Sequence, residues 1–170
     1  MESLNLDQCP DGARVFVDTN ILLYYFAGRS EQCKRFVERC LKNDIHAITS
    51  VVVLIETLHK LMVMEATQAG HATGENAAQY LRAHPRIVQS LNRSEEAIRT
   101  ILDYFEATVA VDVSDLQVSR VLREKFGLLA NDSLILTAMH RKFLRIIATA
   151  DRDFRRIEDL RVYRPTDLTP

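Results

Sequence analysis

The sequence predicts an α/β protein, a three-layer α/β/α sandwich built on a mostly parallel sheet. Short apolar runs rich in β-branched residues alternate with longer segments of helical periodicity. Strands separated by helices in this way imply crossover connections and a sheet covered on both faces. With 170 residues and 47% hydrophobic content, the chain can bury one sizeable core. We therefore expect a single domain over residues 1–170, with an N-terminal leader over residues 1–13.

The first strand is expected at residues 14–17, followed by a short helix over residues 21–26 that Gly28 closes. Ser30 is an N-cap candidate for the next helix. Apolar residues recur in that helix at positions i, i+3, i+4, i+7 and i+8 of one face, namely Cys33, Phe36, Val37, Cys40 and Leu41. The cysteines are therefore expected in the core, because a free cysteine usually packs as a small hydrophobic residue.

A second strand is expected at residues 45–49, and the helix after Ser50 should run to about Ala66. Residues 67–93 contain two glycines and a proline, so we expect short helical pieces or a flexible insertion there. Ser94 is then expected to cap a helix. Its predicted apolar face consists of Ile98, Ile101, Leu102 and Phe105.

The remaining strands are expected at residues 109–111, 144–148 and 160–163. Between the first two, Ser114 and Gln117 have the spacing of a capping box for a helix that ends near Gly127. Asn131 and Asp132 open the following helix. Its apolar face should contain Leu134, Ile135, Ala138 and Met139.

Composition excludes several classes of protein. The net charge of −1 provides no strong overall field for a polyanion, so nucleic-acid binding would depend on local patches. The three cysteines are odd in number and lack C-x-x-C spacing, which argues against a disulfide framework and a zinc site. The N-terminus does not resemble a signal peptide, and no apolar run is long enough to span a membrane. A cytoplasmic protein is expected.

Acidic residues follow two of the predicted strands. In open parallel sheets, ligands bind outside the carboxyl ends of the strands, so Asp18 and Asp151 are expected to face one pocket. Asp132 lies in the first turn of one helix and Glu56 within another, so their convergence depends on how these helices pack. Each residue alone also has a structural explanation, as a turn, cap or exposed helix residue.

Several carboxylates at close range repel one another, and a bound cation is the usual compensation. Mg²⁺ or Mn²⁺ held by carboxylates could bind a phosphodiester oxygen and activate a water molecule, so the pattern points to phosphodiester hydrolysis. Thr19, Asn20 and Thr149 could orient these groups, and Asp153 is a further acid of lower rank.

Other chemistries lack their motifs. The sequence has no G-x-x-x-x-G-K-[ST] or G-x-G-x-x-G loop for a nucleotide and no G-x-S-x-G nucleophile elbow. Glu56 and His59 form an E-x-x-H pair, but no second copy completes a di-iron site.

Four ordered motifs together resemble the PIN-domain family, especially its VapC-type toxin ribonucleases. They are Val15 to Leu23 around Asp18, the acidic Glu56 after the second strand, the Asn131-Asp132 pair, and Thr149 to Phe154. The resemblance implies an α/β/α sandwich and a Mg²⁺- or Mn²⁺-dependent endoribonuclease. Its catalytic and metal-binding residues would be Asp18, Glu56, Asp132 and Asp151.

The resemblance also implies an RNA substrate, an antitoxin protein as partner, and a homodimer. Arg29, Arg152, Arg155 and Arg156 lie near the predicted pocket and could contact RNA, or they could be ordinary surface charges. Three alternatives stay open: an RNA-processing nuclease outside toxin–antitoxin systems, a non-catalytic RNA- or protein-binding module, and a flap-type DNA nuclease, which usually needs additional helices.

Overall fold

The computed structural model describes residues 3–71 and 76–168. In these residues, six strands form one sheet in the order β1-β6-β5-β2-β3-β4, and every neighbouring pair is parallel. The strands are β1 (Leu4–Asn5), β2 (Arg14–Val17), β3 (His46–Ser50), β4 (Ala107–Val109), β5 (Ile146–Ala148) and β6 (Arg161–Arg164). The predicted parallel α/β architecture is therefore confirmed.

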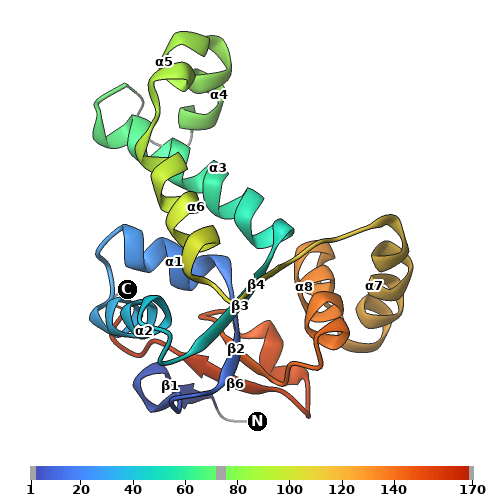
Figure 1. Ribbon diagram of the computed structural model, residues 1–170. Coiled ribbons are helices and arrows are strands. Elements are labelled where there is room, and N and C mark those ends of the chain that lie inside the picture. Colours follow the sequence, from blue (N-terminus) through green and yellow to red (C-terminus); the bar gives the residue numbers. More distant parts are fainter. Residues whose placement is uncertain (1–2, 72–75, 169–170) are drawn as a thin grey trace.

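Helices cover both faces of this sheet. The helices of the described residues are α1 (Thr19–Phe26), α2 (Glu31–Leu41), α3 (Val51–Gln68), α4 (Ala77–Ala83), α5 (Pro85–Ser90), α6 (Arg93–Tyr104), α7 (Val113–Phe126) and α8 (Ala130–Arg141), with short 3-10 helices η1 (Leu6–Gln8) and η3 (Asp153–Arg156). Helices α1 and α2 lie on one side of the sheet, and α7 and α8 on the other (Figure 1). The result is the expected three-layer arrangement.

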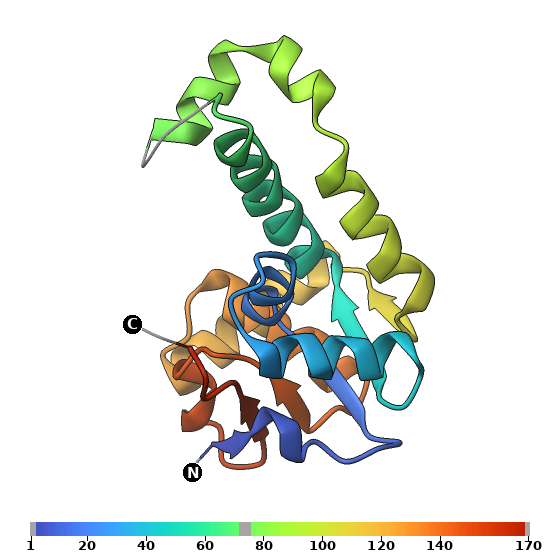
Figure 2. The ribbon, with the colours of Figure 1, turned by 90° about the vertical axis from the view of Figure 1, so that its left-hand side faces the viewer.

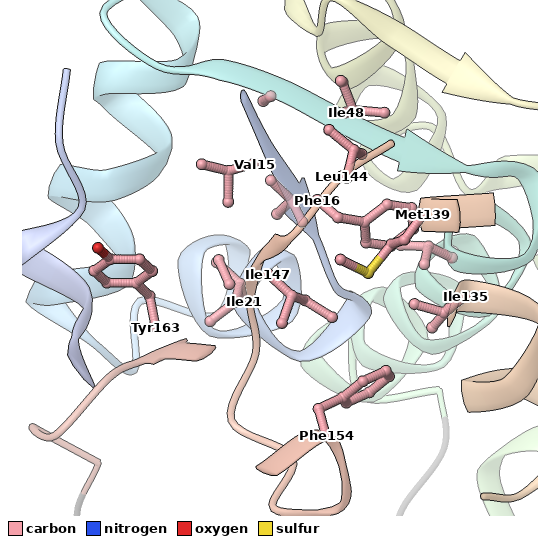
Figure 3. Close-up of a cluster of buried hydrophobic side chains, with 14 of the residues drawn as sticks. Val15, Phe16, Ile21, Ile48, Ile135, Met139, Leu144, Ile147, Phe154 and Tyr163 are labelled. Atoms are coloured by element: carbon pink, nitrogen blue, oxygen red, sulfur yellow. The ribbon is translucent and has the colours of Figure 1, made fainter. Parts of the chain in front are cut away.

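The main core is centred on strand β2. Phe16 is fully buried and lies in register with Ile48 of β3 and Ile147 of β5. Figure 3 shows these side chains beside Ile135 and Met139, both from α8. Cys33 and Cys40 are buried, as their helical spacing suggested, and Cys9 is buried as well.

Helices α3 to α6 form an arm that extends away from the sheet (Figures 1 and 2). Helices α3 and α6 pack side by side, and α4 and α5 lie at the far end of the arm. A separate apolar cluster of Ala66, Leu81 and Leu91 holds that end together. The short helical pieces expected within residues 67–93 are thus present as α4 and α5, while residues 72–75 lie outside the described residues.

The start of α6 differs from the prediction. Ser94 is not the N-cap but lies in the first turn, and the N-cap residue Asn92 makes no side-chain capping hydrogen bond. Instead, the Glu65 carboxylate on α3 accepts hydrogen bonds from the N–H groups of Asn92, Arg93 and Ser94 at 3.0, 3.1 and 3.0 Å. A residue distant in sequence therefore performs the capping, which local spacing could not reveal.

The predicted apolar face of α6 was also wrong at one position. Ile101 is buried, but Leu102 is 52% exposed. Consecutive residues are separated by about 100° around a helix, so the side that places Ile101 in the core turns Leu102 outward.

Two boundaries near α7 were misplaced. Strand β4 pairs with β3 from Ala107 and ends at Val109, so the expected strand at residues 109–111 was two residues late. The capping box is formed by Asp112 and Asp115 rather than by Ser114 and Gln117. An aspartate is as good an N-cap as a serine, and here the extended chain ends at Asp112. The helix ends as predicted at Gly127, whose φ is 66°.

Residues 3–13 contribute to the fold. Strand β1 extends the sheet beyond β6, and Leu6 and Cys9 are buried in the main core. Among the helices of the described residues, none is long and apolar enough to cross a membrane.

Candidate active site

Strand β2 delivers Asp18 to the carboxyl edge of the sheet. The backbone N–H of Asp18 donates to the Ala148 carbonyl of the adjacent β5 at 3.1 Å, so the pairing continues to this residue. Its carboxylate then caps α1, with Oδ1 accepting from the Thr19 N–H at 2.7 Å. The strand end and the helix start together hold a carboxylate that is only 6% exposed.

Two side chains orient the other oxygen of this carboxylate. Asp18 Oδ2 accepts from the Thr149 hydroxyl at 2.6 Å and from Asn20 Nδ2 at 2.7 Å. Asn20 Oδ1 in turn accepts from the Ala150 N–H at 2.8 Å. Asn20 therefore connects the ends of β2 and β5. The structure places Thr19, Asn20 and Thr149, the three residues expected to orient the acids, in contact with Asp18.

Asp151 and Asp153 follow β5 in a tight loop. The Thr149 hydroxyl accepts from the Asp151 N–H at 3.0 Å, and Asp151 Oδ1 accepts from the Asp153 N–H at 2.8 Å. The Asp153 carboxylate forms an ion pair with Arg156. Thr149 thus positions Asp18 and Asp151 at once, whereas Asp153 already has a cationic partner.

Helix α3 brings Glu56 to the same edge. Glu56 Oε2 lies 3.4 Å from the Thr19 hydroxyl of α1 and 3.4 Å from Asn131 Nδ2 of α8. Glu56 Oε1 accepts from Lys60 Nζ at 2.6 Å. Helix α3 thus packs against α1 and α8 in a way that brings Glu56 to the pocket. Lys60 was missed by the sequence reasoning, although its i, i+4 spacing from Glu56 was a usable signal.

Asp132 completes the group from the first turn of α8. Burial, followed by repulsion from the charges of Asp151, Asp18, Asp153 and Glu56, raises its pKa to about 6. Within the described part of the chain, its carboxylate has no hydrogen-bond donor or cationic side chain as a partner. The other acids are therefore close enough to repel Asp132, and no cationic side chain of the described residues compensates for its charge.

Burial also raises the pKa of Asp18 to about 6. The hydrogen bonds from Thr149 and Thr19 oppose this shift by stabilising the ionised form, while the charges of Glu56 and Asp151 add to it. The pKa values of two separate carboxyl groups in this pocket are thus well above their ordinary range.

The donor set fits a divalent cation. The side chains are carboxylates supported by hydroxyl and amide groups, and hard cations prefer oxygen ligands. A cation would also compensate for the charge on Asp132 and relieve the repulsion that raises its pKa. In the present side-chain arrangement of residues 3–71 and 76–168, no three acidic, histidine or cysteine side chains are close enough to share one ion.

The four arginines expected near the pocket differ in their surroundings. Arg29 and Arg152 are exposed, and Arg155 is partly buried. Arg156 pairs with Asp153 and also donates to the carbonyls of Phe126 and Gly127 at 3.4 and 3.3 Å. Arg156 therefore links η3 to the end of α7.

Comparisons with known proteins agree with this architecture. "Ribonuclease VapC2" of Methanocaldococcus jannaschii is 27% identical over 153 residues, which cover 88% of this chain and 92% of that protein. VapBC2 from Rickettsia felis, solved bound to a DNA fragment from its promoter, superimposes with a TM-score of 0.55 at 18% identity, covering 89% of this chain and 98% of that one.

A toxin–antitoxin complex from Klebsiella pneumoniae superimposes with a TM-score of 0.54 at 22% identity, covering 86% of this chain and 94% of the other. At this identity, the structural matches establish a shared fold. The sequence profile of the PIN domain matches residues 15–160, which is most of the chain. The chain therefore belongs to the PIN domain family.

Proposed function

We propose that this chain is a divalent-metal-dependent endoribonuclease that hydrolyses RNA phosphodiester bonds, and that it is the toxin of a type II toxin–antitoxin system. The observation that carries the proposal is the convergence of Asp18, Glu56, Asp132 and Asp151 from four separate elements at one sheet edge. The relative from Methanocaldococcus jannaschii is named a ribonuclease, which supports RNA as the substrate class.

Asp18, Asp132 and Asp151 would hold the cation, for which we propose Mg²⁺ or Mn²⁺, and Glu56 would reach it directly or through water. When bound, such an ion lowers the pKa of an attacking water and offsets the charge of a phosphate. A shared cation explains why these acidic residues lie together. An ordinary structural role explains each of them only singly.

The chain's own residues hold this pocket in shape. Thr149 and Asn20 orient the Asp18 carboxylate, and Thr149 also accepts the N–H that places Asp151. Thr19 and Asn131 hold Glu56 where it can position a water molecule. Asp153 is assigned a supporting role, because its carboxylate is paired with Arg156.

Cleavage assays test the proposal directly. Purified protein would be incubated with a panel of structured RNAs in Mg²⁺, in Mn²⁺ and in EDTA, beside four variants: Asp18→Asn, Glu56→Gln, Asp132→Asn and Asp151→Asn. We expect metal-dependent cleavage that each variant loses while keeping its fold. Asp103→Asn is the matched control, because Asp103 is an exposed carboxylate on α6 near the opposite edge of the sheet.

Undiminished cleavage by both Asp18→Asn and Asp151→Asn would refute the assignment of the acids. An absence of both cleavage and metal binding in the wild-type protein would favour the non-catalytic binding module. A flap-type nuclease would instead cleave branched DNA, which is added to the panel as a further substrate.

The antitoxin and the homodimer belong to the same proposal, as does a cytoplasmic location. The Klebsiella relative was solved as a toxin–antitoxin complex, which supports an antitoxin protein as the partner. The test is whether a small protein encoded beside this chain binds it and blocks cleavage. An active nuclease with no such inhibitor would point to RNA processing. Light scattering of the purified chain would measure the oligomeric state.

A further inference from the structure

Arg164 ends strand β6 at the same sheet edge as the acidic pocket. The Thr149 N–H donates to the carbonyl of Tyr163 at 2.9 Å, and Arg164 is the next residue of β6. Thr149 is the residue whose hydroxyl contacts Asp18. The backbone of Arg164 is therefore one strand away from the residue that orients the central carboxylate.

Among residues 3–71 and 76–168, no side chain or backbone group is a hydrogen-bond or ion-pair partner of the Arg164 guanidinium. Its Nε is buried and has no hydrogen-bond acceptor, and no carboxylate among the described residues forms an ion pair with it. Arginine offers five donors in a fixed geometry, and a buried donor without an acceptor is costly. The residue as a whole is only partly buried at the end of its strand, so the remaining guanidinium N–H groups are accessible to an acceptor from outside the chain.

Other cations are close to Arg164. Desolvation lowers the pKa of this arginine, and repulsion from Arg155 and Arg152 lowers it further, while Tyr24 of α1 acts weakly in the opposite direction. Arg152 follows Asp151 directly in sequence and is exposed. Several arginine side chains thus lie beside the acidic residues. An anion bound between the arginines would relieve the repulsion of their positive charges.

We propose that Arg164 and Arg152 form a phosphate-binding subsite that holds an RNA backbone phosphate next to the one at the carboxylate pocket. This inference rests on the proposed nuclease function for its choice of ligand. RNA fits because it carries a regular series of phosphates. A strand with one phosphate at Asp18 and Asp151 necessarily presents another nearby, and Arg binds phosphate through paired N–H groups. An acidic protein segment is the competing ligand.

The experiment measures RNA binding separately from cleavage. A fluorescein-labelled single-stranded RNA is titrated with protein in EDTA, and anisotropy gives the dissociation constant between about 50 and 200 mM salt. We expect Arg164→Gln to weaken binding several-fold and to reduce the slope of log K against log salt by about 0.7, the value for one phosphate contact on a single strand.

Three further variants make the test specific. Arg152→Gln alters an exposed residue, so it keeps the proposal testable if Arg164→Gln fails to fold; it should produce a similar loss. Arg164→Lys should recover part of the affinity, because a charge without the planar fork is retained. Arg161→Gln is the matched control: Arg161 is exposed on the same strand but at its opposite end, and it should bind RNA as the wild type does.

The outcomes are distinguishable. Wild-type affinity and salt slope in both Arg164→Gln and Arg152→Gln would overturn the subsite, whether or not the protein cleaves RNA. Loss of binding to polyglutamate, with RNA binding unchanged, would assign the arginines to an acidic protein instead. RNA binding that depends on Arg164 in a protein that never cleaves would support the subsite and refute the nuclease.

Discussion

The hydroxyl of Thr149 donates to Asp18 Oδ2 at 2.6 Å, and this bond joins the ends of two adjacent parallel strands. The same hydroxyl accepts the Asp151 N–H at 3.0 Å. One fully buried side chain therefore connects two of the acids. Because it stabilises the ionised form of a carboxylate whose pKa is raised by burial, it also favours the charged state that a cation would need.

Thr149→Val should damage the site more than the fold. Valine has nearly the same shape but no hydroxyl, so Asp18 loses a donor and the Asp151 N–H loses its acceptor. We expect a stability loss of about 1–3 kcal/mol and a decrease in cleavage or metal affinity of about 10–100-fold. Urea unfolding and metal titration would measure these effects.

Thr137→Val is the matched control. Thr137 is also buried, but its hydroxyl donates within α8 to the Ser133 carbonyl at 2.8 Å. Its replacement should leave metal affinity unchanged. Equal losses of metal affinity in the two variants would mean that Thr149 has no specific role at the site.

Divalent metal should stabilise the wild-type protein through Asp132. A ligand that binds only the folded state raises the melting temperature as its concentration increases. We expect Mn²⁺ to raise the melting temperature, EDTA to reverse the effect, and Asp132→Asn to reduce it strongly. The control Asp103→Asn should respond as the wild type does. A full response in Asp132→Asn would remove Asp132 from the ligand set.

Glu65 should make the arm's stability depend on pH. Burial alone would raise its pKa, but the N–H groups of Ser94, Arg93 and Asn92 outweigh burial and the net shift is downward from 4.5. Its stabilising contribution is therefore present above pH 4.5 and is lost as the pH falls through the lowered value. Glu65→Gln should cost about 0.3–1 kcal/mol at pH 7, by removing a negative charge from a helix N-terminus.

Thermal unfolding of wild type and Glu65→Gln across pH 3 to 8 would test this. The difference between them should disappear at the acidic end. Glu158→Gln, a change at an exposed loop carboxylate, should show no comparable dependence. A difference that stayed constant with pH would show that the charge of Glu65 does not contribute.

Phe154 should anchor the loop that carries Asp151. It is fully buried, and Figure 3 shows it in the core below Ile147. Phe154→Ala should cost about 3–5 kcal/mol, since a large core side chain is removed. Phe143→Ala removes the same side chain from a position that is 92% exposed and should change stability by less than about 0.5 kcal/mol. Chemical denaturation would measure the free energy of unfolding of both variants. Similar losses of stability would contradict the difference in burial between the two positions.

Much of the fold followed from local patterns in the sequence. The apolar run before Asp18 predicted the central strand, and the stripe from Cys33 to Leu41 predicted a helix with a buried face. These signals are strong because burial imposes a fixed spacing of apolar residues on each element. The same reasoning placed Asp18 and Asp151 at one edge, since parallel strands end on the same side.

Tertiary structure alone decided the rest. Glu56 meets Asn131 because α3 packs against α8, and Glu65 caps α6 across 27 residues of sequence from Asn92. Arg164 lies beside the site only because β6 pairs with β5, the strand that leads into Thr149. A sequence determines periodicity and local capping through near neighbours, whereas the meeting of distant side chains depends on how whole elements pack, and no local spacing encodes that packing.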